Sequence, residues 1–533
     1  MTFIRKKRVG DSTYLYVVSN TRRGTKVIQT AKYIGKENQL PQLLSNCAIA
    51  NAITSEKLQN LLYQTPVSLW KLMEEMSFQK IISDHFKEKE WGIRAATAAC
   101  VMILNYATDR HSKCRLADWY EQTHLPHLLH IPAQKMNKDL LCRSMDQFTE
   151  KNIYNIHAEI FKTANEKYHF SDDYLFYDTT AVTFEGRGCD LAERSYNAAH
   201  SHNPQINIGL ATTKERFPVM HKVFDGSTKD VSTFAEVMPL LEKTGNLEKT
   251  IFIVDRGITS TTNINLIKSK KANFIFGKPK DRKVSAMISS LKEENFSKFV
   301  GKEMTEDENE MSFYETTHGE DRLVVYWSKK LQGDNLKHRE KKLKLITESL
   351  EKLVKNVDKY TEQKLFEKIG ITCGKTYRNF FDITFADKKL TFSLKPAQID
   401  LANKTEGRYA ILTNTELTPL EVLRRYRSRN FVEMSFKDLK LFVNIGPSRH
   451  WKDRRVVAHV FLAILAMALR SVLELKLRVD YPFMTSEEAL LKLNCVRALV
   501  SNGKILKITG ETDEIRKIVT VLEKPYCFQP PIK

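Results

Sequence analysis

The stretch between residues 174 and 277 orders its strand-forming and helix-forming segments as βββαβαβ. The predicted strands are rich in aromatic and β-branched residues, and the predicted helices carry apolar residues at helical spacing. The expected strands are 174–184 (YLFYDTTAVTF), 206–213, 218–224, 251–254 (IFIV) and 273–277, and the expected helices are 231–243 and 261–271. An antiparallel meander followed by crossover helices predicts an α/β fold, with a mixed sheet and helices packed on it.

Two aspartates fall where this topology brings strands together. The helix after the third strand is a right-handed crossover, which returns the fourth strand parallel to the first. Asp178 lies inside the first strand and Asp255 directly follows the fourth, so we expect the two carboxylates side by side. Aspartate is disfavoured in strand interiors, and ligands of α/β sheets gather at strand ends. Backbone hydrogen bonding by Asp178 and helix capping by Asp255 are the structural alternatives.

A third carboxylate lies in YRSRNFVEMSFKDLK, residues 426–440. As one continuous helix with about 100° per residue, this stretch gathers its polar side chains in an arc of roughly 80°. The stripe consists of Tyr426, Arg429, Glu433, Lys437 and Lys440, and apolar residues cover most of the remaining surface. The pattern predicts a helix buried on most sides, with Glu433 facing a polar cleft. A solvated surface stripe is the alternative.

Three converging carboxylates repel one another unless a cation neutralises them. Mg²⁺, or Mn²⁺ in its place, prefers oxygen ligands and keeps positions for water and phosphate. Two such ions would activate a water or a sugar hydroxyl and stabilise the leaving oxygen of a phosphodiester. Arg429, Lys437 and Lys440 would then hold phosphates, and Tyr426 would supply a hydroxyl or a stacking ring. The constellation predicts a metal-dependent site that cuts DNA.

The charge balance agrees with a polyanionic partner. The chain has 84 Lys and Arg against 64 Asp and Glu, a formal charge of +20, which favours nucleic acid or a membrane surface. The longest apolar run, 456–469, contains His459 and is too short to span a bilayer, so we expect a buried helix. Eight scattered cysteines without CxxC spacing indicate a reducing cytosol, and the N-terminus lacks the features of a signal peptide.

The spacing Tyr426-x2-Arg429-x3-Glu433-x6-Lys440 is similar to the YREK signature of bacterial insertion-sequence transposases with a DDE catalytic triad. YDTTAVTFEG and IFIVDRGITS resemble the segments that hold the first and second Asp of this family. Residues 406–440 and 456–469 also resemble its C-terminal catalytic region. The segment GSTKDVST (226–233) departs from the family by Gly-Ser in place of Gly-Asn, and it retains Asp230.

This resemblance implies an RNase H-like core, a mixed five-stranded sheet with flanking helices, interrupted by a β-rich insertion domain. Asp178, Asp255 and Glu433 would be the metal ligands, while Tyr426, Arg429 and Lys440 would contact the transposon end. Family members hydrolyse a strand at the end of the element and use the freed 3′-hydroxyl to attack target DNA, usually as dimers. The implied partners are therefore double-stranded DNA and a second copy of the chain, without a membrane.

Six segments are expected along the chain. They are a small β element (1–45), a helical domain (46–168), the first part of the core with both Asp (169–280), the insertion domain with strands and a long charged helix (281–404), the second part of the core with the Glu helix (405–483) and a tail (484–533). The helical domain is either a module that binds DNA ends or a plain packing domain. Trp327 is a core residue or a base-stacking ring, and His200 and His202 fit a solvated loop better than a metal site.

The sequence therefore predicts a DNA transposase of the bacterial cytoplasm, associated with the nucleoid. It would bind terminal inverted repeats, cleave the ends by metal-dependent hydrolysis and join the 3′-hydroxyl ends to target DNA. An RNase H-like nuclease without strand transfer and a non-catalytic repressor are the alternatives. Buried negative charge beside a polyanionic ligand disfavours the repressor.

Overall fold

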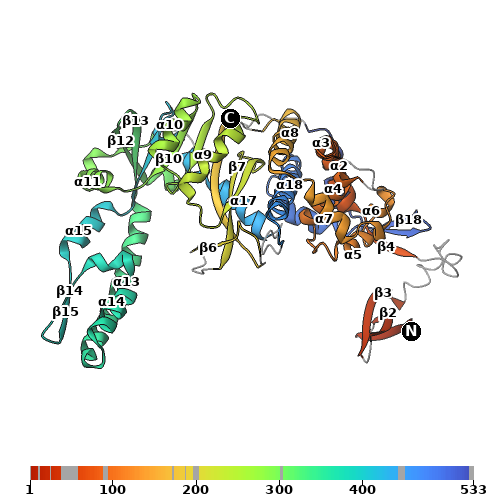
Figure 1. Ribbon diagram of the computed structural model, residues 1–533, viewed down its shortest axis with the longest axis horizontal. Helices are drawn as coiled ribbons and strands as arrows, with labels where there is room; N and C mark the ends of the chain where they lie inside the picture. The colour runs from red at the N-terminus through yellow and green to blue at the C-terminus, as the bar shows by residue number, and fades with distance from the viewer. Residues whose placement is uncertain are drawn as a thin grey trace.

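The computed structural model describes residues 2–9, 12–23, 26–37, 58–87, 94–170, 173–185, 188–195, 203–300, 304–441 and 450–526. Figure 1 shows a central sheet flanked on one side by a group of helices and on the other by an arm that projects away from the sheet. A separate three-stranded antiparallel sheet, β1 (Thr2–Val9), β2 (Ser12–Arg23) and β3 (Lys26–Lys36), lies at the N-terminal end.

The central sheet contains the predicted βββαβαβ succession. Its strands are β5 (Tyr174–Thr183), β7 (Pro204–Thr212), β8 (Pro218–Asp225), β9 (Ile251–Val254) and β10 (Asn273–Lys278), with crossover helices α9 (Asp230–Leu241) and α10 (Thr261–Ser269). β5, β9 and β10 are parallel neighbours, while β7 pairs antiparallel with both β5 and β8. The prediction of an α/β fold with a large mixed sheet and packed helices is confirmed.

The predicted extent of the sheet, five strands, is wrong, because this sheet has ten strands. β16 (Arg408–Thr413) pairs antiparallel with β10, and β13 (Asp321–Ser328), β12 (Met311–His318) and the short β11 (Ser297–Lys298) follow it outward. The short β6 (Glu193–Arg194) pairs with β7. An unpaired edge of β10 would leave backbone donors and acceptors open, and β16 satisfies them. Strands of the predicted insertion therefore belong to the same sheet as the two Asp strands.

The projecting arm has a small core of its own. It consists of α13 (Lys329–Lys355), α14 (Glu362–Tyr377), the hairpin β14 (Phe381–Ala386) and β15 (Lys389–Leu394), and α15 (Pro396–Thr405). Its apolar cluster includes Leu350, Leu365 and Phe381. At the base of the arm, Trp327 is buried, and the Arg408 guanidinium lies 4.6 Å from its ring centre. The interpretation of Trp327 as a core residue is confirmed.

The helical group surrounds one long apolar helix, α18 (Asp453–Leu477), which packs against α4 (Ala95–Ala107) and α7 (Lys138–Asp146). By length and composition, α18 alone among the described helices could cross a membrane, but 94% of its apolar window is buried inside the protein. The prediction of a buried helix here is confirmed. The other helices of the group are α2 (Gln64–Glu75), α3 (Phe78–His85), α5 (Leu116–Glu121), α6 (Leu125–Leu128), α8 (Glu150–Tyr168), α19 (Ser486–Leu493) and α20 (Asp513–Glu523).

One small sheet links distant parts of the chain. β4 (Gln59–Leu62), which the sequence analysis missed, pairs with β17 (Arg497–Ser501), and β17 pairs with β18 (Lys504–Thr509). β4 therefore ties the start of the helical group to the C-terminal segment.

Candidate active site

Strand register places the two aspartates beside each other. β5 and β9 are parallel, and Tyr177 is the register partner of Val254. Asp178 follows Tyr177 within β5, and Asp255 follows Val254 just past the end of β9, so the two aspartates lie at neighbouring positions. This parallel pairing of the first and fourth strands is the one that the sequence analysis expected.

Asp178 is a largely buried carboxylate. Its Oδ1 accepts a hydrogen bond from the Thr179 amide at 2.8 Å. Burial raises the pKa of Asp178 to about 6; the Thr179 hydrogen bond and the Arg429 charge oppose this rise, and the charges of Asp255 and Asp230 add to it. Asp178 forms no ion pair with a described residue, although the charge of Arg429 acts on it.

Arg429 lies between the other two predicted acids. Its guanidinium forms ion pairs with Asp255 and with Glu433, the latter at 2.9 Å. It also donates a hydrogen bond from Nη1 to the Tyr426 hydroxyl at 3.1 Å, and that hydroxyl lies 3.4 Å from Asp255 Oδ1. The side chains of Asp255 and Glu433 are 36% and 52% exposed, so both remain accessible to a ligand.

The predicted single helix over residues 426–440 is wrong. α16 (Pro419–Arg427) ends, Ser428 and Arg429 form a turn, and α17 (Asn430–Leu441) begins after it. The Ser428 hydroxyl donates to the Arg424 carbonyl at 2.9 Å, a local bond by which serine competes with helix propagation. Tyr426 therefore comes from α16 and Glu433 from α17, and the turn brings them to one place.

The predicted burial of this helix on most sides is also wrong. α17 buries one stripe at helical spacing and exposes the opposite face, as an amphipathic surface helix does. The buried residues are Val432, Ser435, Phe436 and Leu439, and the exposed ones are Glu433, Met434, Lys437 and Lys440. Glu433 consequently lies at an open edge of the site instead of inside a closed cleft.

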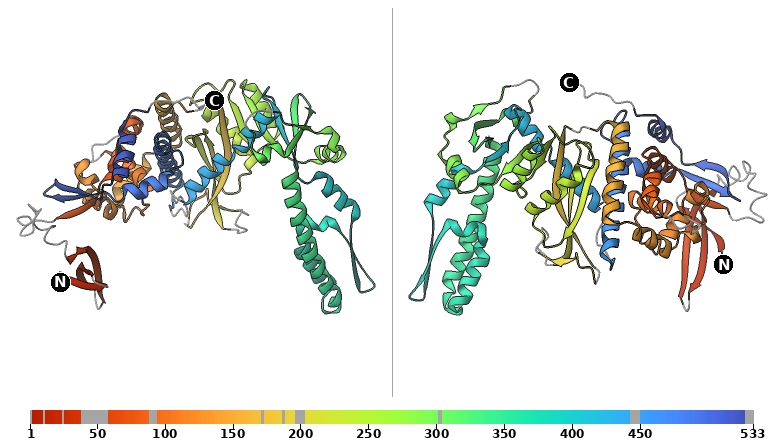
Figure 2. Two further views of the ribbon diagram at one scale, coloured as in Figure 1. Left: turned by 180° about the vertical axis from the view of Figure 1, so that it is seen from behind. Right: turned by 45° about the horizontal axis from the view of Figure 1, so that its top comes forward.

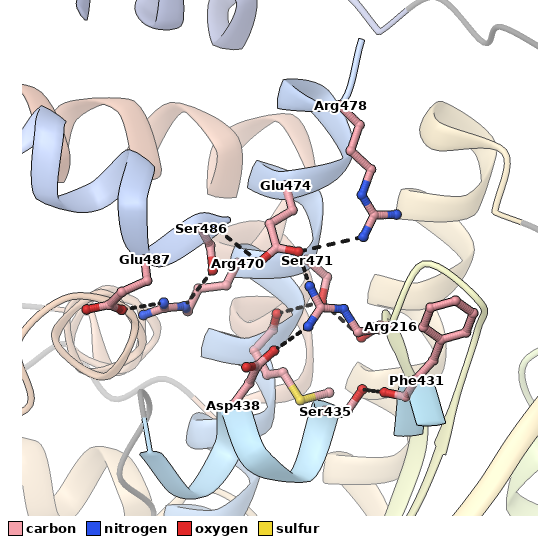
Figure 3. A network of polar contacts seen from close by, with 11 residues as sticks. Arg216, Phe431, Ser435, Asp438, Arg470, Ser471, Glu474, Arg478, Ser486 and Glu487 are labelled. Carbon is pink, nitrogen blue, oxygen red and sulfur yellow. Dashed lines mark hydrogen bonds and ion pairs between the residues drawn. The ribbon is translucent and has the colours of Figure 1, made fainter. Parts of the chain in front are cut away.

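The orientation of α17 depends on a buried arginine that the sequence analysis missed. Figure 3 shows Arg216, from the turn between β7 and β8, between Asp438 on α17 and Glu474 on α18. The distance from Arg216 Nη1 to Asp438 Oδ2 is 2.7 Å, and Ser471 donates to the Arg216 carbonyl at 2.9 Å. In the sequence, Arg216 carries only a turn signal, because its partners lie more than 200 residues away.

Gly277 on β10 makes room for Tyr426. A Cβ atom at this position would lie 2.2 Å from the Tyr426 hydroxyl oxygen and 3.0 Å from Cζ. Burial raises the pKa of Tyr426 to about 12, so its hydroxyl is protonated at neutral pH. The sequence gives no signal for this contact, since it joins two separate elements.

The two lysines of the predicted stripe lie on the exposed face of α17. Partial desolvation of its ammonium lowers the pKa of Lys440, and the nearby Asp178 charge offsets part of this shift. The Lys440 ammonium is therefore close enough to Asp178 for the two charges to interact. Lys437 lies one residue before Asp438, the partner of Arg216.

Asp230 is a further carboxylate near the site whose position the sequence analysis did not predict. It is the first residue of α9, and its Oδ1 accepts a hydrogen bond from the Thr179 hydroxyl at 2.7 Å. Its charge adds to the rise of the Asp178 pKa. His200 and His202 lie outside the described residues.

The carboxylates of the site are chemically suited to bind a hard divalent cation. Within the described ranges, no three His, Cys, Asp or Glu side chains are grouped closely enough to hold a metal ion. The acids present are nevertheless all oxygen donors, as Mg²⁺ prefers, and the poorly neutralised Asp178 favours a nearby cation. Arg429 competes for oxygens of Asp255 and Glu433, so a metal at these two residues requires the guanidinium to shift.

Comparison with known proteins places this region in one family. The model of the transposase DDE domain matches residues 169–469. Among solved structures, the cryo-EM structure of the piggyBac transposase synaptic complex with hairpin DNA aligns with a TM-score of 0.41 and 10% sequence identity, over 82% of each chain. A search of curated proteins finds no match.

Proposed function

The chain belongs to the family of enzymes with a transposase DDE domain, which spans more than half of its length, and we propose that it is the transposase of a bacterial insertion sequence. The domain makes it an enzyme that cleaves DNA and transfers strands. Within the family, we assign it to the branch with the YREK signature. The support for this assignment is the spacing of Tyr426, Arg429, Glu433 and Lys440.

We propose that β8, β7, β5, β9 and β10, in this spatial order, form an RNase H-like core. The support is the antiparallel meander joined to parallel strands through α9 and α10. The remaining segments keep their predicted boundaries as proposals. Residues 46–168 bind the transposon ends, and 281–404 form the insertion between the second Asp and the Glu.

Asp178, Asp255 and Glu433 are the proposed ligands of Mg²⁺ or Mn²⁺. The observation that carries this role is the parallel pairing of β5 and β9, which sets the two aspartates at adjacent register positions. When bound, two such ions activate the attacking oxygen and stabilise the leaving oxygen of the phosphodiester. The protein positions the carboxylates, and Arg429 holds Asp255 and Glu433 together through its two ion pairs.

The other residues of the site hold the DNA backbone. Lys437 and Lys440 project from the exposed face of α17, where lysine side chains neutralise phosphates. Arg429 exchanges its carboxylate partners for a phosphate when DNA enters, because a planar guanidinium can form bidentate hydrogen bonds with either group. Tyr426 donates its protonated hydroxyl to a phosphate oxygen.

The proposed reaction has two stages on double-stranded DNA. The enzyme binds the terminal inverted repeats, hydrolyses a strand at each end and joins the 3′-hydroxyl to target DNA. A dimer that bridges both transposon ends performs this reaction. It acts in the cytoplasm, at the nucleoid. The formal charge of +20 supports an affinity for DNA.

Strand cleavage of a labelled duplex that carries the DNA flanking the gene tests this function. Wild type and Glu433→Gln are compared with Mg²⁺ and with Mn²⁺. The proposal requires cleavage at a repeat boundary by wild type, with DNA binding but no cleavage by Glu433→Gln. Cleavage without joining to a target plasmid would indicate the nuclease alternative, and binding without cleavage under every metal condition would indicate the repressor.

A further inference from the structure

A cavity of about 720 Å³ lies within the helical group, beside the first turn of α18 and outside the DDE site. Its walls come from the loop after α4, from α7 and from the segment that leads into α18, three elements that Figure 1 shows close together. Among the described residues, its lining contains five cationic side chains and no Asp or Glu; the five are Arg110, Lys113, Lys138, Lys452 and Arg455. We name this feature the cationic cavity.

A nearby acid neutralises part of the positive charge of the cavity. Arg455 is paired with Asp146 at 2.6 Å, and Asp146 lies outside the lining. Lys113 donates a hydrogen bond to the Tyr106 hydroxyl at 2.6 Å and lies 4.4 Å from the centre of that ring, so its contacts are neutral. The pKa of the enclosed His450 falls to about 4, because burial and the neighbouring charges of Lys113, Arg455 and Arg110 all oppose its protonation. An anion would relieve this concentration of like charge.

The positive end of a long helix points to the same place. α18 begins at Asp453, and its N-cap residue, Lys452, provides no side-chain cap. The dipole at such a terminus favours a phosphate, and Asp453 in the first turn of α18 offsets part of this effect. The five cationic residues and the helix terminus therefore act together on one small volume.

An exposed aromatic ring lies at the cationic cavity. Trp451 lines the cavity and is 72% exposed, whereas Trp70, Trp119 and Trp327 are buried. An indole ring in water beside lysine and arginine is the combination that binds single-stranded nucleic acid, because cations hold the phosphates and the ring stacks on an unpaired base. The volume is within the range of about 300–1,000 Å³ found for sites that enclose small molecules, so a nucleotide fits and a duplex does not.

We propose that the cationic cavity binds a single-stranded segment of DNA, with a base stacked on Trp451 and the flanking phosphates on the lysine and arginine side chains. The choice of DNA over RNA rests on the proposed function. The cavity is linked mechanically to the DDE site, since α18 lines it at one end and holds α17 through Glu474 and Arg216 further along. A strand bound here would thus be held by the same helix that positions Glu433.

The test uses the full chain and a ten-nucleotide DNA strand that contains 2-aminopurine, whose fluorescence falls on stacking. Trp451→Ala should weaken binding about tenfold and abolish the fall in fluorescence. Lys138→Ala with Lys452→Ala should lower the slope of log K against log salt concentration by about 1.4, at about 0.7 per phosphate contact. Lys341→Ala with Lys344→Ala, on the exposed face of α13, is the matched control and should change neither quantity.

Equal effects in the cavity variants and the control, or no effect in either, would overturn the proposal, as would tighter binding of the matching RNA strand. The cleavage assay on the same preparations separates this inference from the proposed function. Wild type that cleaves, with strand affinity insensitive to Trp451→Ala, overturns the cavity alone. Strand binding that depends on Trp451 and the two lysines, in a protein that never cleaves, supports the cavity and overturns the transposase proposal.

Discussion

Arg216, in the turn between β7 and β8, and Asp438, on α17, form a buried ion pair with 2.7 Å between Nη1 and Oδ2. Burial raises the pKa of the Asp438 carboxyl even though the Arg216 charge opposes this change. The same guanidinium binds Glu474 on α18. Since Glu433 is carried by α17, this arginine ties the third acid of the site to the sheet that carries the first two.

Arg216→Ala should therefore destabilise the protein strongly. The substitution removes the cation that Asp438 and Glu474 share and leaves Glu474 with the longer ion pair to Arg478 at 3.7 Å. Removal of one partner from a buried pair costs about 3–5 kcal/mol. Urea denaturation measures the change in the free energy of unfolding. Arg454→Ala is the control, because Arg454 is 53% exposed and shares Asp146 with Arg455, so its loss should cost at most about 1 kcal/mol. Equal costs for the two variants would show that Arg216 has no special structural role.

Gly277→Ala should displace Tyr426. The added methyl group would lie 2.2 Å from the hydroxyl oxygen, and such overpacking costs about 1–3 kcal/mol. Thermal denaturation of Gly277→Ala, Tyr426→Phe and the double variant forms a cycle in which loss of the hydroxyl should recover part of the cost of the alanine. Gly257→Ala, where an added Cβ meets nothing within 4 Å, is the matched control. Additive effects in the cycle would contradict a direct contact.

The strands of the core could be predicted because their signal is local. β5, β9 and β10 are short runs of aromatic and β-branched residues, and the helices between the later strands predict crossover connections and parallel strands. The register of Tyr177 with Val254 is a detail that the structure supplies. β16 falls within the predicted second part of the core, but the extension of the sheet by β13 had no such signal, since β13 lies in the predicted insertion, more than 40 residues after β10 along the chain.

The residues that the sequence analysis missed depend on tertiary contacts. Helical periodicity predicted one continuous helix through Ser428. In the structure α16 ends there, and the Ser428 hydroxyl donates a hydrogen bond to the Arg424 carbonyl. Arg216 and Gly277 have roles only through partners on distant elements. Spacing could therefore bring Tyr426, Arg429 and Glu433 together, but the direction of α17 and the exposure of Glu433 could not be predicted from it.

The raised pKa of Asp178 predicts a pH dependence of stability. The folded protein holds the proton up to about pH 6, whereas the unfolded chain releases it near 3.8, so this group stabilises the fold at low pH and the contribution is lost as the pH rises through 6. In the presence of a chelator, Asp178→Asn should be more stable than wild type at pH 8, by at most about 3 kcal/mol. The two proteins should converge below about pH 4. Urea denaturation across this range measures the difference, and a constant difference at all pH values would exclude titration of Asp178 as its cause.

Lys440→Ala should weaken the binding of a transposon-end duplex and lower its salt dependence. Lys440 lies on the exposed face of α17 near Asp178, and one lost phosphate contact reduces the slope of log K against log salt concentration by about 0.9 for duplex DNA. Fluorescence anisotropy over a salt series measures this slope, with Lys344→Ala on α13 as the control. Glu433→Gln should keep the wild-type slope, because it removes a negative charge and no phosphate contact. A normal slope for Lys440→Ala, with weakened binding, would mean that the lysine acts by neutralising Asp178 and makes no contact with DNA.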